Sequence, residues 1–293
     1  MKKIAVLGPR GTYCEMACRN YLKENNLNYE IEFYPTILKT MASINSDRIA
    51  IVPFENTLDG FVIESMDSMI LHKYHVIDQV KLNIDFAFVS NAKSIKDIKH
   101  CFVQFKAKGQ CLDFLMNKSF DILQTQSNME SLALVKANDE TYSAIIPMHS
   151  LEENDFNIVI LHVADSNSNE TRFFVLDTLP NYNLNYNNLC SSIVVTAKID
   201  RPGILFDILK EFHDLNINLK SLMSRPMKTE MGKYRFYIEC SLDNNQINKL
   251  EKLTNELSND KDFDVDILGI YKDLGWFLCV QLILLLKKEM VLN

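Results

Sequence analysis

Three short segments of this 293-residue chain gather residue types that can hold an anion or move a proton. The first, Gly8-Pro9-Arg10-Gly11-Thr12-Tyr13, lies between an apolar run and a helical pattern, where free backbone N–H groups can bind an anion. It lacks the GxGxxG and Walker lysine patterns of nucleotide sites. Taken alone, its simpler interpretation is an ordinary tight turn.

The second segment runs from Pro53 to Gly60 and carries an acid, an amide and a hydroxyl at Glu55, Asn56 and Thr57. We expect it to be a turn, because an apolar run precedes it and a helical pattern follows it. Such residues commonly cap the helix that follows. The carboxyl end of a buried strand is also where α/β proteins build binding sites.

The third segment, Asn169 to Phe173, places the hydroxyl of Thr171 beside the fixed positive charge of Arg172, at the start of an apolar strand. A hydroxyl can donate a hydrogen bond to a leaving group, and a guanidinium can pair with a carboxylate. An arginine in this position can also be merely solvated. None of the three segments alone decides the chemistry.

Strands and helices alternate around these segments, which predicts an α/β domain with buried strands. The expected helices lie around residues 16–22, 61–71 and 109–116, and the expected strands are 3–7, 48–52, 82–89, 100–103, 141–146 and 172–177. The Asn-rich stretch 180–188 has no apolar period and marks a linker. We therefore place a first domain at 1–180 and a linker at 181–190.

The second domain is expected at 191–272. Its apolar patterns predict strands at 192–199, 217–223, 234–242 and 265–271, with helices at 204–215 and 247–257. This βαββαβ order predicts a small ferredoxin-like fold.

The tail, 273–293, is atypical because the thirteen residues from Leu274 to Leu286 are almost wholly apolar. A helix needs about 20 apolar residues to cross a bilayer, so we expect no membrane span here. An interfacial helix, or one buried in an oligomer, stays open.

Composition narrows the possible partners and compartments. The net charge of -7 argues against nucleic acid, which needs clustered cations. The seven cysteines are scattered without a CxxC pair, and the six histidines are spread along the chain, so we expect free thiols in a cytoplasmic protein and no metal site. No apolar run near the start resembles a signal peptide.

The motifs, in order, resemble those of one enzyme family. GPRGTYCEMA, VPFENTLDGFV, the Gln110-Cys111 pair and DSNSNETRFFVL are similar to the signature of prephenate dehydratases. DRPGILFDIL, INLKSLMSRP and GKYRFYIEC resemble the ACT domain that follows the catalytic domain in that family. The resemblance runs from Lys3 to Tyr271.

The resemblance implies a catalytic domain of two α/β lobes flanking a cleft, similar to periplasmic binding proteins, and a monofunctional enzyme of phenylalanine biosynthesis. Thr171 corresponds to the family's essential hydroxyl. The implied catalytic residues are Thr171, Arg172, Phe173, Asn56 and Gln110, and the implied substrate-binding residues are Thr12, Tyr13, Glu55, Thr57 and Ser127.

The reaction implied is the loss of carbon dioxide and a ring hydroxyl from prephenate, driven by formation of an aromatic ring. It requires no redox cofactor and no metal. Hydrogen-bond donors suffice to stabilise the departing hydroxyl. We expect Thr171 to donate to this hydroxyl, Asn56 and Gln110 to position the substrate, and Arg172 either to pair with a carboxylate or to brace its loop.

The chain departs from the family pattern before Gln110. Residues 103–109 read VQFKAKG where the family presents Ser-His-Pro-Gln, and the later Ser-Thr pair is Ser127-Asn128. Two alternatives therefore remain, an arogenate dehydratase and a catalytically silent amino-acid sensor of the same fold.

In the ACT domain, the resemblance implies a phenylalanine pocket across the interface of a homodimer or homotetramer, through which phenylalanine inhibits the enzyme. Met223 replaces the family's usual Glu before Ser-Arg-Pro. A domain that only dimerises the chain is the alternative. The implied effector residues are Gly203, Ile204, Leu205, Asn218, Ser224, Arg225 and Pro226.

Overall fold

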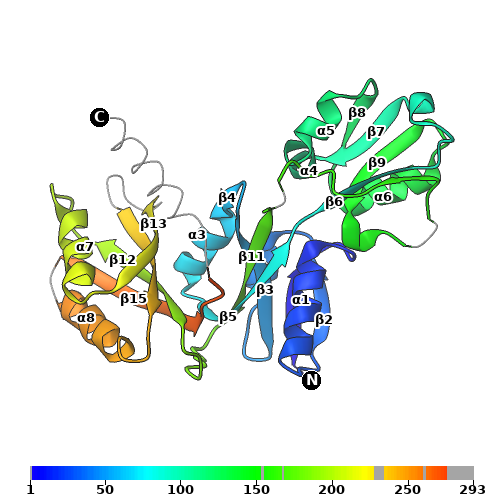
Figure 1. Cartoon of the computed structure of the whole chain (residues 1–293). Helices are drawn as coiled ribbons and strands as arrows, with labels where there is room; N and C mark the ends of the chain where they lie inside the picture. The colour runs from blue at the N-terminus through cyan, green and yellow to red at the C-terminus, as the bar shows by residue number, and fades with distance from the viewer. Residues whose placement is uncertain (1, 153–154, 167, 228–233, 260–261, 276–293) are drawn as a thin grey trace, which may run out of the picture.

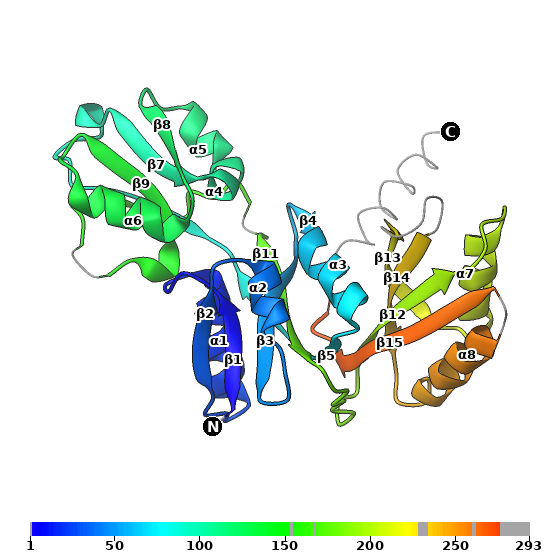
Figure 2. The ribbon, with the colours of Figure 1, turned by 180° about the vertical axis from the view of Figure 1, so that it is seen from behind.

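The computed structural model describes residues 2–275 except 153–154, 167, 228–233 and 260–261. The tail prediction therefore falls largely outside the described residues. Figure 1 shows two lobes on one side and a smaller domain on the other. Figure 2 gives the same arrangement from behind.

The first lobe is built on the strands that carry the first two polar segments. The order across its sheet is β5-β11-β3-β1-β2, and β4 pairs with β3. The strands β1, β2 and β3 are parallel, with fully buried Ile4, Ala5 and Val6 in the central one. Its elements are β1 (Lys3–Leu7), α1 (Tyr13–Glu24), β2 (Glu30–Tyr34), α2 (Ile37–Ala42), β3 (Arg48–Asn56), β4 (Gly60–Phe61), α3 (Ile63–His72), β5 (His75–Asn83) and β11 (Glu170–Asp177).

The second lobe has its own five-stranded sheet in the order β10-β6-β9-β7-β8. Along β6, Phe86 and Phe88 enter one core while Ala87 and Val89 enter another, as expected for a strand covered on both faces. Its elements are β6 (Phe86–Ser90), η1 (Ile95–Asp97), β7 (His100–Gln104), α4 (Phe105–Gly109), α5 (Leu112–Met116), β8 (Asp121–Thr125), α6 (Asn128–Ala137), β9 (Tyr142–Pro147), η2 (Met148–Ser150) and β10 (Ile158–Ile160).

Two crossings join the lobes. The chain leaves the first lobe between β5 and β6 and returns between β10 and β11. The expected single strand 82–89 is wrong, because it spans the first crossing and its two halves belong to different sheets.

The C-terminal domain has the predicted βαββαβ order. Its strands form the order β13-β14-β12-β15, all antiparallel, and both helices lie on the side away from the lobes in Figures 1 and 2. Its elements are β12 (Leu189–Ala197), α7 (Ile204–Asp214), β13 (Asn218–Pro226), β14 (Tyr234–Leu242), α8 (Ile247–Asn259) and β15 (Phe263–Lys272).

The other face of this domain packs on the first lobe. Tyr237 and Tyr271 share one hydrophobic core with Phe54, Met66 and Phe174. β15 also pairs with β5, where Gly269 lies opposite Val76, so one ten-stranded sheet runs through both domains. The C-terminal domain is therefore joined to the first lobe by a shared core as well as by the linker.

Two element boundaries differ from the sequence prediction. Residues 53–56 lie on β3 and not in a turn, because β11 and β4 pair with the end of this strand. The expected helix 109–116 is α5 and begins only at Leu112, where Asp165 accepts hydrogen bonds from the amides of Leu112 and Asp113. A separate short helix, α4, ends at Gly109. Among the described residues, no helix is both long and apolar enough to span a membrane.

We predict that Gly269→Ala destabilises the protein. A Cβ at this position would lie 2.4 Å from the carbonyl oxygen of Val76, where β15 and β5 meet. Overpacking of this kind costs about 1 to 3 kcal/mol of unfolding free energy. Chemical denaturation measures the change. Gly109→Ala is the control, since its Cβ would meet nothing within 4 Å. Equal stabilities of the two variants would contradict the prediction.

Candidate active site

The second and third polar segments meet where β3 ends and β11 begins. Thr171 lies opposite Asn56, and Arg172 lies opposite Glu55. Successive side chains of a strand point to opposite faces. The pair Asn56 and Thr171 therefore occupies one face, and the pair Glu55 and Arg172 the other.

Asn56 organises the first face. Its Nδ2 donates hydrogen bonds to Thr171 Oγ1 at 2.9 Å, to Asn169 Oδ1 at 2.8 Å and to the backbone oxygen of Glu170 at 3.0 Å. Its Oδ1 accepts from the backbone amides of Leu58 and Asp59 at 2.9 and 3.0 Å. Because its nitrogen faces acceptors and its oxygen faces donors, the amide of Asn56 has only one favourable orientation.

The same group extends to the second lobe through Gln110. Asn169 Nδ2 donates to Gln110 Oε1 at 3.0 Å, and Gln110 Nε2 donates to Asp59 Oδ2 at 3.3 Å. Lys106, on α4, has its Nζ 3.7 Å from the same Asp59 oxygen. The structure thus brings Asn56, Gln110 and Thr171 together through Asn169.

These groups can bind and orient an anionic molecule through hydrogen bonds. They comprise a hydroxyl, three amides, one exposed ammonium group and the half-exposed carboxylate of Asp59. Among the described residues, no group of three or more His, Cys, Asp or Glu is placed to hold a metal ion.

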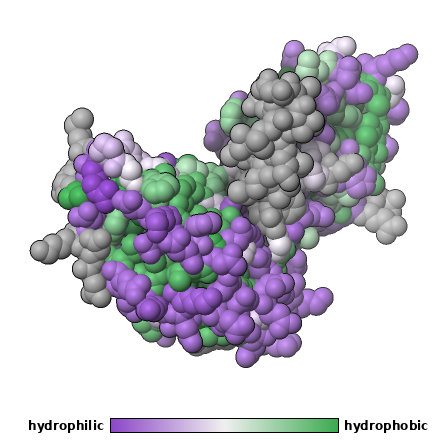
Figure 3. All heavy atoms as spheres, turned by 60° about the vertical axis from the view of Figure 1, so that its left-hand side comes forward, coloured by the Kyte–Doolittle hydropathy of each residue, from purple (hydrophilic) through white to green (hydrophobic). Residues whose placement is uncertain are grey.

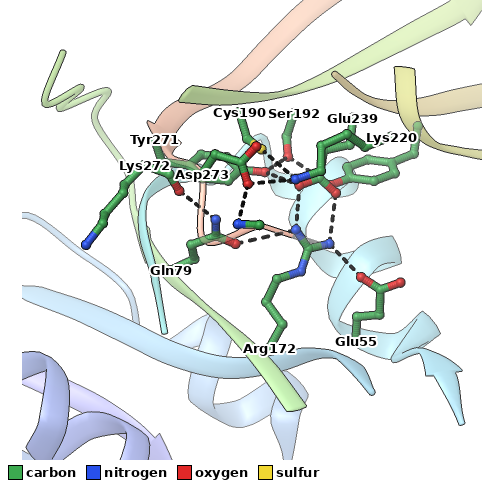
Figure 4. A network of polar contacts seen from close by, with 12 residues as sticks. Glu55, Gln79, Arg172, Cys190, Ser192, Lys220, Glu239, Tyr271, Lys272 and Asp273 are labelled. Carbon is green, nitrogen blue, oxygen red and sulfur yellow. Dashed lines mark hydrogen bonds and ion pairs between the residues drawn. The ribbon is translucent and has the colours of Figure 1, made fainter. Parts of the chain in front are cut away.

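The opposite face is buried and faces the C-terminal domain. Arg172 Nη2 donates to Glu55 Oε2 at 2.7 Å and to Glu239 Oε2 at 2.8 Å, and Nη1 donates to Glu239 Oε1 (Figure 4). Burial raises the pKa of the Glu55 carboxyl, although Arg172 opposes the shift. For Arg172, the two carboxylates outweigh burial and raise its pKa.

This arrangement changes the expected positions of three residues. Arg172 and Phe173 were expected among the catalytic groups and Glu55 among the substrate contacts, but all three are at least nine-tenths buried. Glu55 is bound to Arg172, and Phe173 belongs to the hydrophobic core. Both carboxylates that pair with Arg172 come from this chain, Glu55 and Glu239.

Thr57 and Ser127 also fix the local backbone. The Thr57 hydroxyl donates to Ser168 O at 3.0 Å and accepts from Glu170 N at 2.9 Å, so it holds the segment that precedes Thr171. Ser127 is the N-cap of α6 and accepts from Glu130 N at 3.1 Å. Neither hydroxyl contacts the group around Asn56 within the described part of the chain.

Thr12 and Tyr13 lie at the start of α1. The Tyr13 hydroxyl donates to the backbone oxygen of Asp85, at the crossing between the lobes, and accepts from its amide at 3.0 Å. Burial raises the pKa of Tyr13. Thr12 lines a cavity of about 310 Å³ with Gly11, Met16 and His149, among others.

The predicted effector residues lie at two ends of the C-terminal domain. Asn218 begins β13 and lines a cavity of about 330 Å³ that also includes Asn216 and Gln246. Ser224, Arg225 and Pro226 end the same strand, and Arg225 pairs with Asp67 of α3 at 2.8 Å. Gly203 is the N-cap of α7 with φ 85°, followed by Ile204 and Leu205.

The sequence prediction missed two residues of this site, Asn169 and Asp59. Asn169 is 2% exposed and bridges Asn56 to Gln110. It precedes Thr171 by two residues, and this period-2 spacing was the available signal. The contact of Asp59 with Gln110 depends on the approach of the second lobe, which no local pattern encodes.

The fold and the site define a two-lobed α/β protein followed by a ferredoxin-like βαββαβ domain. The model of the prephenate dehydratase family matches residues 4–181, and that of the ACT domain matches residues 191–258. The chain belongs to the prephenate dehydratase family.

Relatives agree with this assignment. A prephenate dehydratase of Methanocaldococcus jannaschii is 30% identical over 265 residues, covering 90% of this chain and 95% of the relative. The crystal structure of the prephenate dehydratase of Staphylococcus aureus has 29% identity and a TM-score of 0.76, covering 92% of this chain and 100% of that one. The crystal structure of the prephenate dehydratase of Arthrobacter aurescens in complex with L-Phe has a TM-score of 0.79 at 21% identity. The similarity covers 92% of this chain and 90% of that one, and it supports the fold.

We predict that Asn56→Asp destabilises the protein, because an oxygen would replace the Nδ2 donor and face two acceptors, Asn169 Oδ1 and Glu170 O. An unsatisfied buried polar group costs about 1 to 3 kcal/mol, which denaturant unfolding can measure. Asn157→Asp is the control, because this exposed residue donates to Asn91 O alone. Equal losses in both variants would contradict the prediction.

Proposed function

We propose that this chain converts prephenate to phenylpyruvate in phenylalanine biosynthesis. The membership of the family and the hydroxyl and amides at the end of β3 and the start of β11 support this activity. In the reaction, the bond from the ring to its carboxylate breaks and releases carbon dioxide. The electron pair completes the aromatic ring and expels the ring hydroxyl, which takes up a proton and leaves as water.

The observation that carries the proposal is the direction of the hydrogen bond between Asn56 and Thr171. Asn56 Nδ2 donates to Thr171 Oγ1 at 2.9 Å, so the hydroxyl oxygen acts as the acceptor. Among the described residues, the Thr171 O–H donates to no partner, and its proton can be directed at a ligand. A hydroxyl stabilises the charge on the leaving group by hydrogen bonding, since its own acidity is too weak for full proton transfer.

Lys106 can pair with a carboxylate of the substrate. Its side chain is 60% exposed and lies beside Asp59, which also accepts from Gln110. This cation comes from the segment that lacks the family's Ser-His-Pro-Gln. We propose that Lys106 supplies there part of the attraction for prephenate, which carries two carboxylates.

We expect Thr171→Ala to lower kcat for prephenate about 100-fold or more, because removal of one preorganised donor to a developing charge costs 10²–10³ in rate. Thr171→Ser should retain most of the activity. The measurement is phenylpyruvate formation followed by absorbance. Thr178→Ala is the control, since this exposed threonine follows the far end of β11.

Near-normal kcat in Thr171→Ala would sink the proposed role of this hydroxyl. The same assay with arogenate separates the alternatives. Faster turnover of arogenate than of prephenate identifies an arogenate dehydratase. A folded wild-type chain that turns over neither substrate identifies an amino-acid sensor.

We propose the division 1–180, 181–190 and 191–272 for the catalytic domain, the linker and the regulatory domain. The end of β11 at Asp177 and the start of β12 at Leu189 support this division. We also place the chain in the cytoplasm. The six cysteines of the described residues are free and buried, as is usual in a reducing compartment.

Phenylalanine is the proposed inhibitor, and a homodimer or homotetramer the proposed assembly. β13 is an edge strand of the ten-stranded sheet. Antiparallel pairing of this edge with a second copy would bring Asn218 of one chain near the Ser224–Pro226 end of the other. Leu222, on this edge strand, is 40% exposed. Figure 3 turns the domain forward and shows both hydrophobic and hydrophilic side chains on its surface.

The cavity beside Asn218 suits a small zwitterion. Its volume of about 330 Å³ lies at the small end of ligand pockets. Amide side chains offer donors and acceptors for an amino group and a carboxylate, and Leu189 and Leu242 add apolar surface. The complex of the Arthrobacter aurescens enzyme with L-Phe supports the choice of ligand.

We expect Asn218→Ala to raise the phenylalanine concentration needed for half-inhibition about tenfold, because one hydrogen bond to a charged group contributes about 1.5 kcal/mol or more. Inhibition curves with prephenate measure the effect. Asn255→Ala, on the exposed side of α8, is the control. Wild-type inhibition in Asn218→Ala would place the effector elsewhere.

A further inference from the structure

The contact between Arg172 and Glu239 joins the strand of the catalytic hydroxyl to the regulatory domain. Arg172 Nη1 donates to Glu239 Oε1 and Arg172 Nη2 donates to Glu239 Oε2, a two-point pairing with fixed geometry. The side chains are 8% and 1% exposed. Figure 4 shows Arg172 reaching up from the first lobe and Glu239 facing it from the regulatory domain.

Other strands of the regulatory domain hold the two partners in place. Tyr271, on β15, donates to Glu239 Oε1 at 3.1 Å and also contacts Ser192 of β12 at 2.6 Å. Gln79 Oε1 accepts from Arg172 at 3.4 Å, and its Nε2 donates to Lys272 O at 2.6 Å. The position of the guanidinium is therefore set by three strands, β12, β14 and β15, of the other domain.

Removal of Glu239 would leave the buried Arg172 with one carboxylate partner, Glu55. A buried charge that loses a partner is strongly unfavourable, so the guanidinium must move toward Glu55 or toward water. Arg172 directly follows Thr171 on β11, at a register shift of the ladder between Arg172 and Phe173. A movement of Arg172 is thus transmitted through one peptide unit to the position of Thr171 relative to Asn56.

We propose that Glu239 is a positioning residue for the reaction, and that it acts through Arg172 to hold the Thr171 hydroxyl in its productive place. This inference rests on the proposed function. The catalytic domain then depends on the regulatory domain for one element of its site, even without phenylalanine. Small displacements are enough, because a misplacement of about 1 Å can reduce a rate 10²-fold.

The test is Glu239→Gln in the full chain, assayed with prephenate in the absence of phenylalanine. We expect kcat to fall about 10-fold or more while KM changes less than threefold, because Thr171 acts on the leaving group and not on substrate binding. Glu239→Asp, which keeps the charge, should recover part of kcat. A merely structural role would lower the unfolding temperature without this kcat loss.

Asp67→Asn is the matched control. Asp67 and Arg225 form another two-point ion pair between the domains, at 2.8 and 2.9 Å, but Asp67 lies on α3 and not beside Thr171. We expect its kcat to stay within twofold of the wild type. An equal kcat loss in Asp67→Asn would overturn the inference, since any weakening of the domain contact would then suffice.

Tyr271→Phe is a milder variant that decides the question if Glu239→Gln does not fold. It removes the hydroxyl that donates to Glu239 and should lower kcat a few-fold. Wild-type kcat in folded Glu239→Gln, or in Tyr271→Phe where the first variant is unfolded, would overturn the inference while the proposed function stands. No phenylpyruvate from the wild type would overturn both.

Discussion

Arg172 forms a buried ion pair with Glu55 of the first lobe and with Glu239 of the regulatory domain. A guanidinium this deeply buried is tolerated only where carboxylates compensate its charge, and here they come from two domains. The pairing fixes the start of β11 against both β3 and the regulatory domain. Thr171 directly precedes Arg172 on β11, so the same pairing also restrains the position of its hydroxyl.

Strand geometry explains why the residues of the two motifs come in adjacent pairs. Glu55 and Asn56 lie opposite Arg172 and Thr171 across one antiparallel ladder. Alternation sends the amide and the hydroxyl to one face and the ion pair to the other. Each motif therefore contributes one residue to the polar group around Asn56 and the next or preceding residue to the buried ion pair.

The site depends on orientation more than on acid strength. The Asn56 amide is held by hydrogen bonds to both its oxygen and its nitrogen. Asn169 accepts a hydrogen bond from Asn56 and donates one to Gln110 on the second lobe. Formation of the aromatic ring drives the loss of carbon dioxide, so the main task of the protein is to donate a hydrogen bond to the departing hydroxyl. A rigid set of amides and one hydroxyl, with Lys106 at the edge, is suited to that task.

The sequence alone predicted the βαββαβ order of the second domain, most strands of the first domain and the family, and it singled out Asn56, Gln110 and Thr171 as candidate site residues. These follow from local periodicity and short motifs. The three-dimensional fold was needed to show that residues 53–56 form a strand, that 82–89 divides between two sheets, and that Arg172 is buried against Glu55 and Glu239. The reason is physical: the partner of Arg172 is Glu239, 67 residues away, and no local pattern encodes which distant carboxylate will neutralise a buried charge.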